Sequence, residues 1–214
     1  MPKLTVAVAK GRLQDEALAL LARAGVVVSK EALSSRRLAI EDETGNYRFI
    51  LVKPADVAVY VEHGIADCGV VGSDVVLESQ TNLLQPLSLN IGRCRMVVAA
   101  LGGVSLTNFG MLRVATKYPH AAAEHFASKG VPVEIIQLSG AVELAPMLGL
   151  ADCIVDLVET GRTLRENGLE EIEPIVECTG CLVVNRASYQ LKAATISRLI
   201  GALTLAADTG VASQ

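Results

Sequence analysis

The sequence predicts an α/β fold with two lobes, mostly parallel sheets and a cleft between the lobes. Short apolar runs rich in β-branched residues alternate with helical patterns along nearly the whole chain, which is typical of helices packed on parallel strands. The segment Gly64–Cys68 recurs 85 residues later as Gly149–Cys153, and a helical pattern precedes each copy. The chain has 214 residues, of which 51% are hydrophobic, enough for one large core or two smaller ones.

The first half of the chain begins with a continuous apolar run, Leu4–Ala9, as expected of a strand buried on both faces. An Ala- and Leu-rich helix, 14–24, follows and stops at Gly25, which favours a helix C-terminus. The turn residues 43–46 separate two runs that predict a hairpin. The other expected elements are the hairpin strands 37–41 and 47–52, helix 54–63 with Pro54 in its first turn, strand 68–71, helix 73–79 and strand 84–89.

The second half repeats the alternation of strands and helices. Strand 112–116, a helix over 120–129 that ends at Gly130, and strand 133–138 predict a βαβ unit. The remaining expected elements are helix 142–148, strand 153–158, helix 163–167, strands 172–178 and 181–186, and a long helix over 188–207.

The repeated segment favours two related lobes, although a chance match plus the common connection of helix, Gly and strand is an alternative explanation. We place lobe I at 1–91 and 184–214 and lobe II at 92–183, with a crossing near Arg93 and Arg95. Ligands bind at the carboxyl ends of strands in open α/β sheets. We therefore expect the loops after the two repeated strands, 72–74 and 159–163, to face the cleft.

Composition excludes several classes of function. The formal net charge is −4 and aromatics make up 3% of the residues, so neither a basic surface nor a stacking platform for nucleic acid is expected. The apolar runs near both ends are too short for a signal peptide or a membrane span, and we expect a cytoplasmic protein. Sequence motifs of P-loop hydrolases, dinucleotide-binding dehydrogenases and GxSxG esterases are missing.

The five cysteines are expected to be reduced thiols. Cys178 and Cys181 have CxxC spacing, but a second ligand pair for zinc is missing and the motif joins two apolar runs. We interpret it as a tight turn. His120 and His125 are five residues apart on a predicted helix, so they point in different directions and are poor co-ligands for a metal.

The strongest local signal for a ligand site is the segment from Asp156 to Thr163. A buried strand leads into Glu159, Thr160, Gly161, Arg162 and Thr163, and a helix then begins. Backbone N–H groups at such a helix start, with Thr hydroxyls beside them, suit a phosphate, and the two acids suit sugar hydroxyls. A ribose phosphate fits both features. An ordinary βα turn with Thr160 as helix N-cap is the alternative.

Cations and a helix start follow three other predicted strands. Lys10, Gly11 and Arg12 come directly after the first strand, and two cations around a Gly fit a nucleotide or polyphosphate. Lys53 follows another strand. Ser73 and Asp74 open a helix, with Ser73 expected to be its N-cap. A solvated turn, for the cations, and simple capping, for Ser73, are the alternatives.

The segment from Glu143 to Leu164 resembles the signature of the ATP phosphoribosyltransferase family. The signature has a Glu, a Gly six positions later, a small residue, an aliphatic residue, Asp-aliphatic and [ST]-G-x-T-[LM]. The matching positions are Glu143, Gly149, Ala151, Ile154, Asp156, Leu157, Thr160, Gly161, Thr163 and Leu164. The opening 10–13 and the segments 60–67 and 71–74 are also similar to the family, so the resemblance spans essentially the whole chain.

The resemblance implies two α/β lobes like those of type II periplasmic binding proteins. The chain looks like the short form of the family, which lacks a C-terminal regulatory domain. Short forms work with a catalytically inactive relative of histidyl-tRNA synthetase (HisZ) that supplies activation and histidine feedback. The resemblance thus implies a homodimer within a hetero-oligomer, with no nucleic acid or membrane partner.

The implied reaction joins ATP to 5-phosphoribosyl 1-pyrophosphate (PRPP), the first step of histidine biosynthesis. A neutral adenine nitrogen attacks the anomeric carbon, so no strong base is needed, and Mg²⁺ carried mainly by substrate phosphates assists the leaving pyrophosphate. By resemblance, Thr160, Gly161, Arg162 and Thr163 bind the 5-phosphate of PRPP, and Asp156 and Glu159 face the ribose. The expected contacts of ATP and pyrophosphate are Lys10, Gly11, Arg12, Lys53, Ser73 and Asp74.

Two other functions would use parts of the same pattern. A non-enzymatic solute-binding or effector-sensing module has the same two-lobed fold, but it normally carries a signal peptide or a DNA-binding helix-turn-helix, and we see neither. Another phosphoribosyltransferase would share the phosphate loop but not the opening Lys10–Arg12 or the second lobe.

Overall fold

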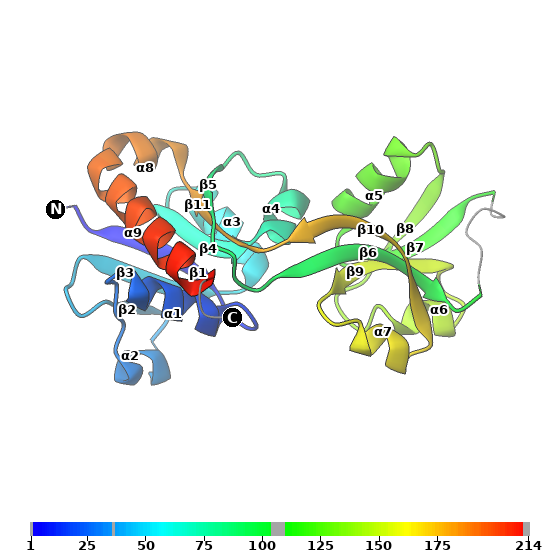
Figure 1. The fold of residues 1–214 in the computed structure, drawn as a ribbon. Helices are drawn as coiled ribbons and strands as arrows, with labels where there is room; N and C mark the ends of the chain where they lie inside the picture. Colours follow the sequence, from blue (N-terminus) through cyan, green and yellow to red (C-terminus); the bar gives the residue numbers. More distant parts are fainter. Residues whose placement is uncertain (1, 36, 104–109, 212–214) are drawn as a thin grey trace. The chain divides into compact units, whose positions relative to one another are not determined.

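The computed structural model describes residues 2–35, 37–103 and 110–211. They form two compact units (Figure 1). The first unit comprises the residues up to Gly92 together with those from Thr179 onward, and the second is Arg93–Cys178. The predicted α/β class with two lobes is confirmed. Among the described residues, no helix combines the length and apolar character needed to cross a bilayer.

The sheet of the first unit is built around the apolar strand that opens the sequence. Its strands are β1 (Leu4–Ala9), β2 (Ala39–Glu41), β3 (Tyr47–Val52), β4 (Cys68–Gly72), β5 (Leu84–Ser88) and β11 (Gly180–Val184), in the order β2-β3-β1-β4-β11-β5. β1 pairs in parallel with β3 and β4, and β2, β11 and β5 add antiparallel pairs. β1 is buried along almost its whole length, as its continuous apolar run predicts.

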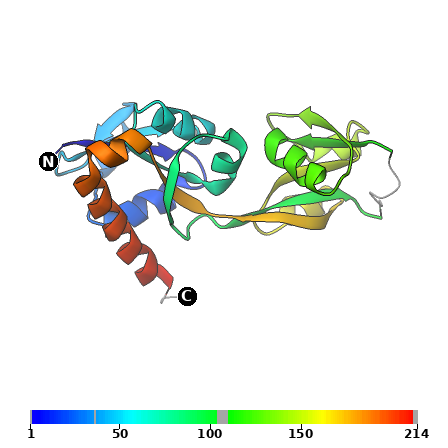
Figure 2. The same ribbon diagram turned by 90° about the horizontal axis from the view of Figure 1, so that it is seen from above.

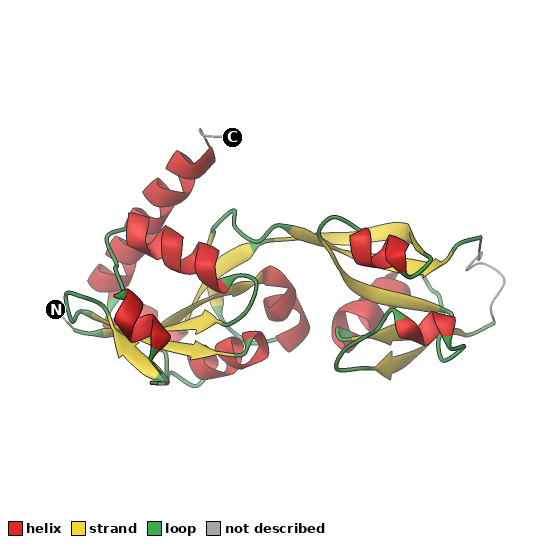
Figure 3. Ribbon diagram, turned by 90° about the horizontal axis from the view of Figure 1, so that it is seen from below, coloured by secondary structure: helices red, strands yellow, loops and turns green. Residues whose placement is uncertain are grey.

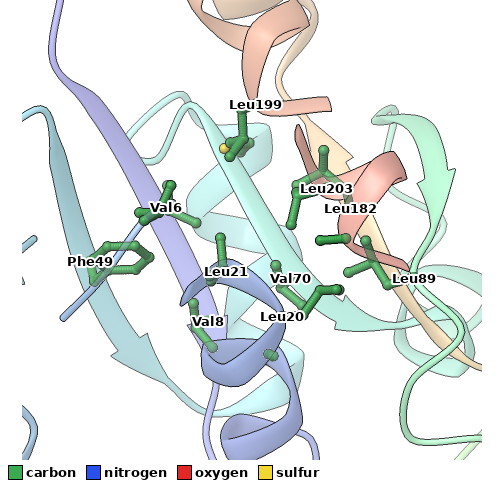
Figure 4. Close-up of a cluster of buried hydrophobic side chains, with 14 of the residues drawn as sticks. Val6, Val8, Leu20, Leu21, Phe49, Val70, Leu89, Leu182, Leu199 and Leu203 are labelled. Atoms are coloured by element: carbon green, nitrogen blue, oxygen red, sulfur yellow. The ribbon is translucent and has the colours of Figure 1, made fainter. Parts of the chain in front are cut away.

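Helices cover both faces of this sheet (Figure 3). They are α1 (Gln14–Arg23), α2 (Lys30–Ser34), α3 (Pro54–Glu62), α4 (Ser73–Ser79), α8 (Arg186–Leu191) and α9 (Ala193–Val211). On one face, Leu20 of α1 and Leu199 of α9 pack with Phe49 and Leu182 of the sheet (Figure 4). Truncating such a fully buried leucine to alanine costs about 2–5 kcal/mol. α3 covers the other face with Val57 and Val61.

The long helix expected over 188–207 is two helices, because Lys192 interrupts it. The backbone of Lys192 has left the helical region at φ −121°. Its ammonium group donates to a carboxylate oxygen of Asp67, at 2.8 Å, and to the carbonyl of Lys3, at 3.0 Å. These contacts hold the break between α8 and α9 against the start of β1.

The second unit has its own sheet and its own core. Its strands are β6 (Cys94–Leu101), β7 (Leu112–Thr116), β8 (Val133–Gln137), β9 (Cys153–Val158) and β10 (Leu169–Cys178), in the order β10-β6-β9-β7-β8. β9, β7 and β8 are parallel, and β6 is antiparallel to both β9 and β10. α5 (Pro119–Ser128) covers one face with Phe126 (Figure 2). α6 (Leu144–Met147) and α7 (Arg162–Glu166) cover the other face with Ala145 and Leu164.

Both sheets are mixed, and the antiparallel pairs arise mainly from the two crossings of the chain. Strands within the βαβ units are parallel, as predicted. β6, β10 and β11 flank the crossings, and a chain that leaves a unit and returns runs in opposite directions on its two passes. β6 and α2 are additions to the predicted elements.

The crossings lie at Gly92/Arg93 and Cys178/Thr179, whereas we expected boundaries at 91/92 and 183/184. Residues 179–183 belong to the first unit and not to lobe II, because β11 pairs along its length with β4. The interpretation of Cys178–Cys181 as a tight turn is therefore wrong. Cys178 ends a strand of one sheet and Cys181 lies in a strand of the other.

The repeated segment makes the same contacts in both units. The amide of Asp67 donates to the carbonyl of Thr5, and the carboxylate of Asp67 accepts from the amide of Thr5, both at 2.8 Å. Asp152 and Arg113 exchange the same two hydrogen bonds, again at 2.8 Å. Gly64 and Gly149 have φ +70° and +73°, the left-handed conformation that glycine accepts most readily. Each Asp thus ties the strand it opens to the neighbouring parallel strand.

Candidate active site

The sequence-predicted residues of the first unit meet at one edge of its sheet. β3, β1 and β4 are adjacent and parallel, so their carboxyl ends lie side by side. Lys53 follows β3, Lys10 follows β1 and Ser73 follows β4. The amide of Lys10 donates to the carbonyl of Val52 at 2.8 Å, which extends the β1–β3 pairing into the loop. The fold therefore gathers these three loops at the edge where α/β proteins bind ligands.

The loop after β1 presents two exposed cations. Lys10 and Arg12 are both exposed. Gly11 between them has φ +98°, a backbone conformation that side chains disfavour, and nothing lies within 4 Å of the position a Cβ would take. The carbonyl of Gly11 accepts from the amide of Gln14 at 3.0 Å, which starts α1. Lys53 is also exposed and precedes the first turn of α3.

The helix start after β4 differs from the prediction. Gly72, not Ser73, is the N-cap of α4. The Ser73 hydroxyl instead accepts a hydrogen bond from the amide of Thr179 at 3.2 Å, so it holds the chain where it enters β11. Asp74 is 8% exposed, and its carboxylate oxygen lies 2.1 Å from the position of a Cβ on Gly72. A side chain at Gly72 would displace that carboxylate.

The predicted site of the second unit is centred on Asp156 near the carboxyl end of β9. Asp156 is 9% exposed, and its Oδ1 accepts from the amide of Leu157 at 2.8 Å. Its Oδ2 lies 3.8 Å from Nζ of Lys117, which follows the parallel neighbour β7. Burial raises the pKa of the Asp156 carboxyl, and the amide of Leu157 and the ammonium of Lys117 oppose that rise. Because the side chain of Asp156 is buried, its charged form depends on polar partners such as these.

Gly161 is the N-cap of α7 in the loop after β9. It has φ +72°, in the left-handed region. The ordinary turn capped by Thr160 is therefore not what forms here. Because Gly161 has no side chain, the N–H groups of the first helical turn have no side-chain cap. Glu159, Thr160 and Thr163 are exposed in the same loop. These donors and hydroxyls are the groups that a phosphate requires.

Two of the loop's other residues have partners in the structure. Nε of Arg162 donates to Oε1 of Glu166 at 2.7 Å, one turn along the same helix. The carbonyl of Thr163 accepts from the side-chain amide of Asn167 at 2.9 Å. The Arg162–Glu166 pair is exposed, and such a pair contributes little to stability, so Arg162 can exchange this partner for an anion.

Lys117 is a functional candidate that the motif analysis did not assign, whereas Arg95 was a candidate only because it lies near the expected crossing between the lobes. Lys117 directly follows the predicted strand 112–116, so the rule applied to Lys10 and Lys53 would have selected it. Arg95 donates to both carboxylate oxygens of Glu171, at 2.6–3.1 Å, and its Nη1 lies 3.4 Å from the carbonyl of Glu159. Arg95 thus links β10 to Glu159, the first residue of the loop after β9. Its strand, β6, was not predicted.

The described residues contain no group of three His, Cys, Asp or Glu side chains arranged to hold a metal ion. His120 lies 3.6 Å from Glu124, and His125 contacts Glu173 at 2.8 Å, so the two histidines have separate partners, as their spacing predicts.

Comparisons with known proteins agree on one family. The family model HisG, ATP phosphoribosyltransferase, matches residues 53–204. An ATP phosphoribosyltransferase of Geobacillus kaustophilus is 50% identical over 200 residues, covering 94% of this chain and 96% of the relative. One of Bacillus subtilis is 46% identical over 205 residues, with 96% of each chain covered.

Solved structures give the same result. A chain from the ATP phosphoribosyl transferase (HisG:HisZ) complex of Thermotoga maritima is 37% identical, with a TM-score of 0.84 over 96% of this chain and 99% of the other. Protein AF1704 of Archaeoglobus fulgidus, at 12% identity and a TM-score of 0.61 over 97% of this chain and 78% of the other, shares the fold. The matched residues include the edge loop at Lys53, the helix start at Ser73 and all of residues 159–163, and the chain belongs to the ATP phosphoribosyltransferase family.

Proposed function

We propose that this chain joins ATP to PRPP, giving N1-(5-phosphoribosyl)-ATP and pyrophosphate, and that the loop after β9 holds the 5-phosphate of PRPP. The observation that carries the assignment of the loop is Gly161, a left-handed N-cap that leaves the first turn of α7 without a side-chain cap. This reaction is a phosphoribosyl transfer and the first step of histidine biosynthesis.

The chemistry requires positioning more than acid–base catalysis. The attacking group is a neutral ring nitrogen of adenine, which loses no proton before it attacks the anomeric carbon. Binding both substrates in line replaces a bimolecular encounter, and cations stabilise charge on the departing pyrophosphate. Asp156 and Glu159 accept hydrogen bonds from the ribose hydroxyls in this proposal. Lys117, 3.8 Å from Asp156, opposes the rise in pKa that burial gives this carboxyl.

The loops after β1, β3 and β4 bind the polyphosphates of ATP and pyrophosphate. Lys10, Arg12 and Lys53 supply the positive charge, and Gly11 lets backbone approach an oxygen closely. Ser73 and Asp74 complete this edge, where the hydroxyl of Ser73 also holds Thr179. When bound, Mg²⁺ would be held mainly by the phosphate oxygens of the substrates and would stabilise charge on the departing pyrophosphate, and Asp156 and Glu159 are the carboxylates that this loop could offer it.

We further propose that the chain works as a homodimer within a hetero-oligomer that includes a HisZ-type subunit. The support is a relative that is 37% identical and comes from a HisG:HisZ complex. Neither nucleic acid nor a membrane is part of the proposal. Because ATP and PRPP are intracellular metabolites, the proposed location is the cytoplasm.

The activity is tested by the absorbance change that accompanies formation of phosphoribosyl-ATP, with ATP, PRPP and Mg²⁺ all required. The loop assignment is tested by PRPP calorimetry on Gly161→Ala. Gly168→Ala is the matched control, because Gly168 has φ +69° and nothing within 4 Å of a new Cβ, but lies at the far end of α7. We expect at least tenfold weaker PRPP binding for Gly161→Ala, about 1.4 kcal/mol, and unchanged binding for Gly168→Ala. Equal affinities would contradict the assignment.

The cation assignment is tested by Arg12→Ala. We expect lower turnover and weaker ATP binding with little change in melting temperature, because an exposed charge contributes little to folding. Arg23→Ala, an exposed arginine in the last turn of α1, is the control and should leave both parameters unchanged. If Arg12→Ala has wild-type kinetics, the loop after β1 is a solvated turn.

A further inference from the structure

We propose that Cys94 and Cys178 are a redox-modification site that forms a reversible disulfide across β6 and β10. Both are thiols in the structure. They are direct register partners in the antiparallel pairing of these two strands. Directly opposite residues in an antiparallel pair have Cα atoms about 4.5–5.5 Å apart, and disulfides span about 4.4–6.8 Å. The register therefore places the two Cα atoms within the range that a disulfide spans.

The side chains point to the same face of the sheet. Residues directly opposite each other in an antiparallel pair project to the same side. Cys94 and Cys178 both pack in the hydrophobic cluster that α5 covers with Ala121, Ala122 and Phe126. The two thiols therefore share one environment, in addition to facing each other across the ladder.

Cys94 and Cys178 are the most accessible of the buried thiols. Cys94 is the first residue of β6 and Cys178 the last of β10, and backbone pairing continues beyond them, where the amide of Gly180 donates to the carbonyl of Ile91 at 2.7 Å. Cys94 is 7% exposed and Cys178 3%, whereas Cys68, Cys153 and Cys181 have no exposed surface. Burial raises the pKa of those three thiols to about 12, which keeps them protonated and unreactive.

The oxidant in this proposal is a low-molecular-weight disulfide. The thiolate of Cys94, the more exposed of the two, attacks one sulfur, expels one thiolate that takes up a proton, and forms a mixed disulfide. The thiolate of Cys178 then attacks the Cys94 sulfur and expels the second small thiol. The protein loses two hydrogen atoms and gains one S–S bond, and the small disulfide becomes two thiols.

The bond would tie together the two places where the chain crosses between the units. Cys94 is the second residue of the unit Arg93–Cys178, and Cys178 is its last. A disulfide here closes nearly the whole unit into one covalent loop. A cross-link that closes a long loop restricts the unfolded chain and stabilises the folded one.

The test is incubation of the full chain with the small disulfide, followed by thiol counting under denaturing conditions and peptide mapping without reduction. We expect wild type to lose two of its five thiols, to yield a linked Cys94–Cys178 peptide, and to recover both thiols with excess reductant. We also expect the oxidised form to melt about 5 °C or more above the reduced form.

Cys94→Ala should lose no thiol and show no such shift. Cys153→Ala removes another buried thiol from the same cluster and should behave like wild type, which separates the cross-link from the cost of a cavity. If Cys94→Ala does not fold, Cys178→Ala and the wild-type peptide map replace it. Five unreacted thiols, a mixed disulfide that does not cyclise, or a bond to any other cysteine would overturn the proposal.

Discussion

Asp156 carries a conflict between stability and function. Its carboxylate is buried, and burial raises its pKa above the ordinary value. A raised folded-state pKa means that the folded protein binds the proton more tightly than the unfolded chain does. The protonated carboxyl group therefore favours folding at acidic pH, and that contribution is lost as pH rises through the folded pKa. Ionising Asp156 thus lowers the free energy of unfolding.

Asp156→Asn tests this directly. The amide keeps the shape of the side chain and removes the buried charge, so we expect the melting temperature at pH 7 to stay the same or rise. PRPP affinity should fall tenfold or more, because the ribose hydroxyls lose a charged acceptor. Calorimetry and thermal melting on the same samples check both effects. A variant that melts lower and still binds PRPP normally would show that Asp156 is structural.

Lys117 should act through the protonation of Asp156. Lys117→Gln removes the cation that opposes the raised pKa of that carboxyl, so the pKa should rise further. In the proposed site the ribose hydroxyls bind the ionised carboxylate, so the loss of PRPP affinity at acidic pH should begin at a higher pH in the variant. Affinity measured from pH 5 to pH 8 tests this prediction. Lys129→Gln, whose partner is Glu173, is the control and should leave the pH at which affinity falls unchanged.

At the scale of elements, two equivalent aspartates join parallel strands in the two units. Asp152→Ala removes the hydrogen bonds that its carboxylate accepts from the amide and the guanidinium of Arg113 in β7, and we expect a loss of about 1–3 kcal/mol in unfolding free energy. Asp67→Ala also leaves the ammonium of Lys192 without its carboxylate partner, so we expect a loss of about 3–5 kcal/mol in unfolding free energy. Glu41→Ala, at an exposed ion pair with Lys3, should change stability by less than about 0.5 kcal/mol. Denaturant titration measures all three.

The Arg113–Asp152 pair also predicts a pH dependence. Hydrogen bonding from Arg113 holds the pKa of Asp152 below its ordinary value of 3.8. A lowered folded-state pKa gives stability that is complete above the ordinary value and is lost as pH falls through the folded one. We expect Arg113→Gln to be less stable than wild type at pH 7. The difference in unfolding free energy between the two proteins should become smaller below about pH 4. Arg48 lies 3.7 Å from Glu41 at the surface, and Arg48→Gln should differ little from wild type in unfolding free energy at either pH.

The sequence predicted elements that have local signals. The β1 strand, the helix with Pro54 and the strand of Asp156 lie where periodicity and turn residues place them. β6 and the boundary after Cys178 were missed, because a strand's membership of a sheet depends on distant pairing and not on its own pattern. The helix break at Lys192 depends on its distant partner Asp67.

In the candidate site too, features with local sequence signals were predicted and contacts between distant residues were not. Strand ends are local, so Lys10, Lys53 and the loop around Gly161 were found. Gly72 is the N-cap of α4, and the hydroxyl of Ser73 accepts a hydrogen bond from the amide of Thr179. Thr179 is over a hundred positions away in the sequence, so a local motif could not predict this contact. The Lys117–Asp156 contact required knowing that β7 and β9 are neighbours.

At the scale of the whole molecule, the proposed HisZ-type subunit predicts that catalysis and histidine regulation belong to different subunits. We expect the chain alone to bind PRPP, to turn over slowly and to be insensitive to histidine. Adding the partner should raise turnover and confer inhibition by histidine, because coupling requires a second site and the proposal places it on the partner. Histidine titrations of the isolated chain and of the reconstituted complex distinguish the cases. Saturable inhibition of the isolated chain would move the sensor onto this chain.

The place of β11 in its sheet has a consequence during synthesis on the ribosome. β11 lies between β4 and β5, although both strands emerge long before it. The first unit therefore cannot close its sheet until Gly180–Val184 has left the exit tunnel, whereas Arg93–Cys178 is continuous and complete before then. Since contiguous domains generally fold as they emerge, the second unit is expected to reach its native state first. Until β11 emerges, β4 and β5 each lack the strand that pairs with both of them.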